Sequence, residues 1–74
     1  MDSSGYVVTR YDTKSKVFTY RGDNLGKLLM EAKGEADAGD YITAHFVILD
    51  SLGDVAYDDL VVDFKVEEKE KEYA

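Results

Sequence analysis

Only one segment of this chain has the apolar spacing of a helix, and the segments on either side of it alternate as strands do. Its apolar residues follow the i, i+3, i+4, i+7, i+11 spacing of one helical face: Leu25, Leu28, Leu29, Ala32 and Ala36. The pattern predicts a helix over about 25–38, with Asp23 or Asn24 as N-cap and Gly39 as a left-handed C-cap. A lone amphipathic helix must bury this face against a sheet.

The segments before the helix predict a β-hairpin. Runs 6–11 and 16–21 are rich in Val, Tyr, Thr and Phe, and turn-forming residues 12–15 separate them. Phe18 and Tyr20 are expected in the core. The register of the hairpin stays open. With a four-residue loop, the residues on the same face as Phe18 and Tyr20 are Val7, Thr9 and Tyr11. With a three-residue loop, they are Tyr6, Val8 and Arg10.

The segments after the helix predict the rest of the sheet. Residues 41–49 are almost continuously apolar, which is typical of a central strand, and 55–57 and 60–66 alternate as strand material. Asp58-Asp59 interrupts this last stretch as a bulge or a second turn. We therefore expect an α+β fold of order ββαββ, whose antiparallel sheet has four strands, or five if the last one splits.

The chain length allows one core, because 74 residues are too few for two domains. We expect a single domain over 1–66 and a frayed, charged tail over 67–74. No segment reaches the ~20 apolar residues of a membrane span, and the first residues lack the pattern of a signal peptide. These features predict a cytoplasmic protein with no membrane association.

The residue types present give little basis for catalysis. The chain has no cysteine and one histidine, which excludes disulfides, thiolate zinc sites and a histidine metal cage. His45 has no serine or aspartate at the spacing of a catalytic motif. Residues 50–59 lack EF-hand ligand spacing, and no glycine-rich phosphate loop is present. We expect no enzyme activity, no catalytic residue, no cofactor and no bound metal.

Charge is distributed unevenly along the chain. Residues 1–33 hold six basic and four acidic side chains, whereas residues 34–74 hold three basic and twelve acidic ones. This asymmetry favours a small acidic protein-binding module or inhibitor, of the kind carried by phages and other mobile elements, that engages a basic protein surface. The carboxylates expected to bind the partner are Asp50, Asp54, Asp58, Asp59 and Asp63.

Two alternatives remain open from the sequence. Basic residues interleave with aromatic ones in the hairpin, which is a pattern of nucleic-acid binding, although the acidic half would repel a polyanion. The residues of this alternative patch are Arg10, Lys14, Lys16 and Arg21. The other alternative is a structural subunit of a larger assembly.

One helix of this length covers only one face of a four-stranded sheet. The apolar residues expected on the uncovered face are Tyr41, Val47, Leu49 and Val61. Because an exposed apolar face marks an interaction site, the pattern predicts a homodimer, in which either two sheets pack back to back through these four residues or a strand edge pairs with its counterpart.

Overall fold

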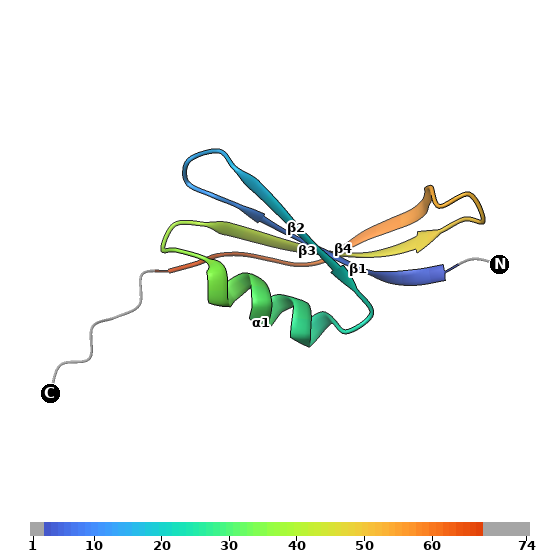
Figure 1. The fold of residues 1–74 in the computed structure, drawn as a ribbon, viewed down its shortest axis with the longest axis horizontal. Coiled ribbons are helices and arrows are strands. Elements are labelled where there is room, and N and C mark those ends of the chain that lie inside the picture. The colour runs from blue at the N-terminus through green and yellow to red at the C-terminus, as the bar shows by residue number, and fades with distance from the viewer. Residues whose placement is uncertain (1–2, 68–74) are drawn as a thin grey trace, which may run out of the picture.

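The computed structural model describes residues 3–67, which form one four-stranded antiparallel sheet with a helix on one face (Figure 1). The elements are β1 (Ser3–Tyr11), β2 (Val17–Gly22), α1 (Leu25–Glu35), β3 (Tyr41–Leu49) and β4 (Val55–Lys65). The strand order is β2-β1-β3-β4. The predicted α+β fold and its ββαββ order are confirmed, with four strands. Residues 68–74 of the predicted tail lie outside the described residues.

The hairpin adopts the register of the three-residue loop. The Asp12 N–H donates to the Lys16 carbonyl at 2.8 Å, and Ser15 between them has a φ of 73°. A left-handed residue at the end of a three-residue loop is a common way to close a hairpin. Arg10 therefore lies opposite Phe18 and shares its face.

The long strand β4 is continuous and carries two irregularities. Asp58 and Asp59 pair in register with Val47 and Phe46 of β3, so the interruption predicted at these two aspartates is wrong. The unpaired extra residues are instead Ala56 and Val61, one on either side of the aspartates. Bulges of this kind bend a strand and increase its twist without ending it.

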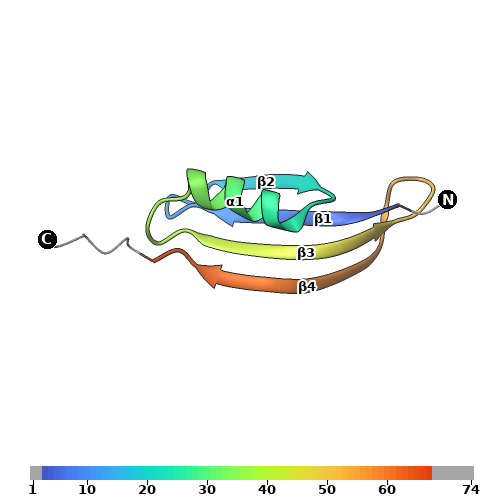
Figure 2. The same ribbon diagram turned by 90° about the horizontal axis from the view of Figure 1, so that it is seen from below.

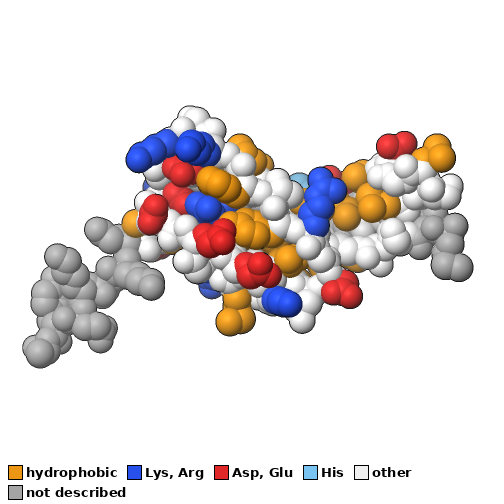
Figure 3. Space-filling model, in the orientation of Figure 1, with side chains coloured by type: hydrophobic (Ala, Val, Ile, Leu, Met, Phe, Trp, Pro, Cys, Tyr) orange, Lys and Arg blue, Asp and Glu red, His pale blue; other side chains and the backbone are white. Residues whose placement is uncertain are grey.

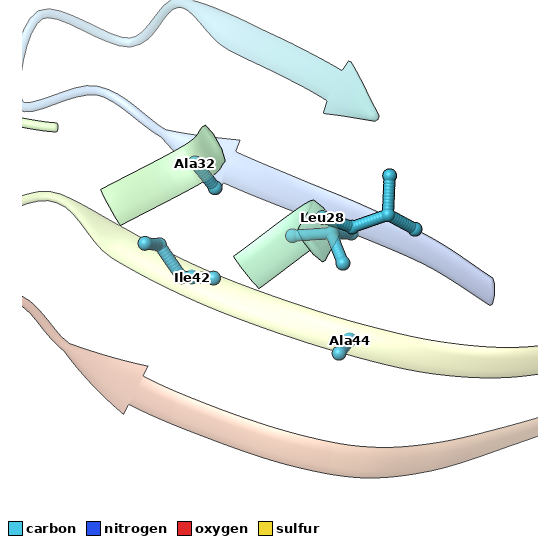
Figure 4. Close-up of a cluster of buried hydrophobic side chains, with 5 residues drawn as sticks. Leu28, Ala32, Ile42 and Ala44 are labelled. Carbon is cyan, nitrogen blue, oxygen red and sulfur yellow. The ribbon is translucent and has the colours of Figure 1, made fainter. Parts of the chain in front are cut away.

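The core lies between α1 and the three strands β1, β2 and β3 (Figure 2). Its buried members are Val8, Leu28, Ala32, Ile42 and Ala44, four of which are labelled in Figure 4. The predicted helical stripe is confirmed, since Leu28 and Ala32 are buried and the other three residues pack around them. Phe18 was expected in the core, but it is 36% exposed. Its ring lies at the border of the core, where the ring centroid is 4.1 Å from the guanidinium carbon of Arg10.

Local polar contacts set both ends of α1. Asn24 is the N-cap, and its side chain accepts a hydrogen bond from the Lys27 N–H at 3.2 Å. The helix ends at Glu35, three residues before the predicted end, because Ala36 is already extended. Gly39 is left-handed with a φ of 96°, but it serves the turn before β3 and does not cap the helix.

Within residues 3–67, no helix is long and apolar enough to cross a membrane.

Two glycine substitutions should change stability in opposite directions. A Cβ at Gly39 would be in left-handed backbone and only 2.9 Å from Thr13 Cγ2, so Gly39→Ala should lower the free energy of unfolding by about 1–3 kcal/mol. A Cβ at Gly34, on the helix, meets nothing within 4 Å, so Gly34→Ala should raise it by about 0.5–1 kcal/mol. Urea denaturation of both variants measures this, and a stabilising Gly39→Ala would contradict the turn geometry.

Candidate interaction surface

A buried ion pair joins the first strand to the turn before the third. Arg10 Nη1 lies 2.9 Å from Asp40 Oδ2, and the two residues are 6% and 1% exposed. A charged pair with so little solvent contact is stable only when further hydrogen bonds satisfy it. Arg10 therefore does not belong to an exposed basic patch, which corrects its place in the alternative nucleic-acid site.

Further polar contacts surround this pair. The Asp37 N–H donates to Asp40 Oδ2 at 3.1 Å, and Arg10 Nε donates to the Tyr20 hydroxyl at 3.3 Å. The Tyr20 hydroxyl in turn donates to the Glu35 carboxylate. The Asp37 amide, followed by Arg10, lowers the pKa of Asp40 below its ordinary value against the opposing effect of burial. The network connects the hairpin, the end of α1 and the start of β3.

The other three residues of the predicted basic patch are exposed and lie on β2 and in the loop before it. Lys14 is in the hairpin loop, Lys16 precedes β2, and Arg21 lies near the end of that strand. Space-filling representation shows basic side chains gathered at the hairpin loop, with hydrophobic side chains exposed along the molecule toward the β3–β4 turn (Figure 3). The predicted patch is therefore reduced to three residues along the β2 edge.

The predicted acidic residues follow β4, the opposite edge of the sheet. Asp58, Asp59 and Asp63 lie on the strand and Asp54 directly precedes it. Every residue from Val55 to Val61 is exposed. The structure thus places three of the five predicted carboxylates on one edge strand and a fourth directly before it.

Asp50 has a different role from the other four carboxylates. Its Oδ1 accepts hydrogen bonds from the N–H groups of Leu52 and Asp54, both at 2.9 Å. These bonds hold the β3–β4 turn, in which Gly53 has a φ of 87°. Asp50 is therefore a turn-forming residue at the end of the acidic edge.

Two of the β4 carboxylates contact side chains of β3. His45 Nδ1 lies 2.7 Å from Asp58 Oδ1, and the Tyr41 hydroxyl donates to Asp63 Oδ2 at 2.6 Å. The bond to Asp63 raises the pKa of Tyr41, because an ionised phenol would face a carboxylate. No hydrogen bond or ion pair to the carboxylates of Asp54 and Asp59 is found among residues 3–67.

The open face of the sheet, on the side away from α1, contains a hollow of about 380 Å³. Its apolar lining residues include Val7, Val47, Leu49 and Val55, and its polar ones include Arg21, His45 and Asp58.

The four residues of the predicted dimer face differ in their exposure because of this hollow. Val47 is only 7% exposed, because the residues around the hollow enclose it, whereas Tyr41 and Val61 are 39% and 44% exposed. Leu49 is half-buried beside Val47. The four predicted residues therefore do not form one projecting apolar surface, and Val47 is not available for direct packing against a flat partner.

Comparison with protein-family models, curated proteins and solved structures found no match to this chain. Within residues 3–67, no three His, Asp or Glu side chains converge as metal ligands. The geometry of the site is therefore the basis for a functional proposal.

Replacing Asp40 should change the response of stability to acid. Since folding lowers the pKa of Asp40, its contribution is complete above the ordinary value of about 3.9 and is lost as the pH falls through the lower folded value. Asp40→Asn should be less stable than wild type at neutral pH and lose less stability between about pH 5 and about pH 2. Urea denaturation across this range measures both effects.

Asp37→Asn is the matched control, since its exposed side chain lies in the same turn. It should keep the neutral-pH stability close to that of wild type. Equal losses for the two variants would show that the ion pair does not hold the turn.

Proposed function

We propose that this chain is a non-enzymatic protein-binding module that adds a basic, extended segment of another protein to the outer edge of β4. One observation carries the proposal: β4 is an 11-residue edge strand that α1 leaves uncovered and that bears a row of carboxylates. An uncovered edge presents unpaired backbone donors and acceptors to an added strand.

The composition of β4 supports a basic partner. Asp58, Asp59 and Asp63 are opposed on the strand only by Lys65. The same strand carries exposed apolar side chains: Val55 and Tyr57 precede Asp58, and Leu60 and Val61 lie between Asp59 and Asp63. A partner strand that alternates basic and apolar residues would pair with both kinds, while its backbone forms the ladder.

The hollow on the open face extends this surface. Val55 and Asp58 of β4 line it together with Val47, so it begins directly beside the edge strand. An apolar side chain of the added segment can enter it and displace water from the valine and leucine surfaces. The hollow therefore holds an apolar side chain of the added segment. The backbone of β4 sets the direction of that segment, and the carboxylates favour basic residues in it.

Neutralising the acidic edge should weaken binding of a basic strand. The probe is a synthetic eight-residue peptide that alternates lysine and valine, with a glutamate–valine peptide as the charge control. The triple variant Asp58→Asn, Asp59→Asn, Asp63→Asn should bind the lysine peptide roughly fivefold more weakly, since the lysines of an alternating peptide share one face with Asp58 and Asp63, and each exposed ion pair contributes about 0.5 kcal/mol. Titration calorimetry or fluorescence anisotropy measures this, at low salt and again at about 1 M salt.

The matched control removes three exposed carboxylates elsewhere: Asp23→Asn, Glu31→Gln and Glu67→Gln. It changes the net charge equally and should keep most of the affinity. The proposal is wrong if both triple variants lose affinity equally, or if the wild type does not distinguish the two peptides.

A further inference from the structure

The two free edges of the sheet carry opposite charge. The β2 edge has Lys16 and Arg21 and no acidic residue within Val17–Gly22. The β4 edge has Asp58, Asp59 and Asp63 within its eleven residues. In the strand order β2-β1-β3-β4 these are the two outermost strands, so neither outer edge has a paired strand within residues 3–67.

The directions of these strands are also compatible with each other. Each neighbouring pair in the sheet is antiparallel, so β1 and β4 run one way and β2 and β3 run the other. If a second copy is placed beside the first by translation along the sheet, its β2 lies antiparallel to β4 of the first. The junction therefore continues the antiparallel pattern.

We propose that the basic partner of the β4 edge is the β2 edge of a second copy of this chain, so that copies associate head to tail into an extended sheet. This inference rests on the proposed function, because it assigns the same β4 edge to a particular partner. Such a contact is heterologous, and each added copy leaves one β2 edge and one β4 edge free. Association then continues beyond a dimer.

In this arrangement, the residues that oppose each other at the junction lie on the same face of the extended sheet. Arg21 lies on the open face, opposite Val7, and Asp58 lies on the same face, where it contacts His45. When Arg21 of one copy opposes Asp58 of the next, Thr19 opposes Leu60 on the same face. Phe18 then opposes Val62 on the helix face, because the bulge at Val61 takes up one residue. The register joins one pair of unlike charges, Arg21 and Asp58, and brings apolar side chains together beside it.

Symmetric alternatives bring like charges together. Two copies joined through β4 would place six aspartates from the two strands at one junction, and two copies joined through β2 would place lysines and arginines together. Like charges close together across a strand pair are destabilising. Charge complementarity therefore favours the β2-to-β4 junction over a two-fold dimer.

A charge-reversal experiment tests this assembly. Variant one carries Asp58→Lys and Asp63→Lys, and variant two carries Lys16→Glu and Arg21→Glu. The mass of the wild type in light scattering should rise past that of a dimer over roughly two decades of protein concentration. Each variant alone should stay monomeric because its two edges repel, and an equimolar mixture should associate again. Circular dichroism first establishes that both variants fold.

The contradicting outcomes are equally specific. A wild type that stays monomeric, or stops at a dimer, overturns the head-to-tail junction, as does a mixture that remains monomeric. Association of each variant as strong as that of the wild type would also overturn it. The lysine–valine peptide separates the two proposals, since wild type that binds this peptide but does not self-associate retains the β4 edge as a site for a different protein.

Discussion

The size of α1 relative to the sheet is the constraint on which the surface of this protein depends. Eleven helical residues span about 16 Å, whereas the eleven residues of β4 extend over about 36 Å. The helix covers β1, β2 and β3 and leaves most of β4 exposed. A short helix on a long sheet therefore leaves the β4 edge uncovered, and a single helix leaves one face of the sheet open.

The buried Arg10–Asp40 pair joins residues that are thirty positions apart in the sequence. It lies at the end of the sheet where the hairpin, the last turn of α1 and the start of β3 meet. A buried charge without its partner is strongly unfavourable, so the pair specifies how these three segments meet. It also removes one basic residue from the predicted patch, whose other three residues lie on β2 and in the loop before it.

The fold was largely predictable because local patterns encode it. The spacing of Leu28 and Ala32 marked the buried side of the helix, and the apolar run 41–49 marked the central strand. Hairpin register was not predictable, since it depended on Ser15 adopting a left-handed conformation that serine rarely takes. Neither was the end of the helix, which is set by a turn whose Asp40 carboxylate accepts from the Asp37 N–H.

The candidate site was predictable only in part. Three aspartates close together in sequence lie on one strand and a fourth directly precedes it, so their alignment could be foreseen, whereas the turn-holding bonds of Asp50 required the turn geometry. The burial of Arg10 could not be foreseen, since its partner is thirty residues away in sequence. The hollow around Val47 is lined by residues of all four strands, so no short segment of the sequence carries a signal for it.

Backbone amide exchange of the β4 edge, followed residue by residue by NMR, tests the central claim most directly. On addition of the lysine–valine peptide, alternate amides of Val55–Lys65 that point away from β3 should become protected from exchange. Protection confined to α1 or to the β1–β2 hairpin, with the β4 amides unchanged, would contradict strand addition at this edge.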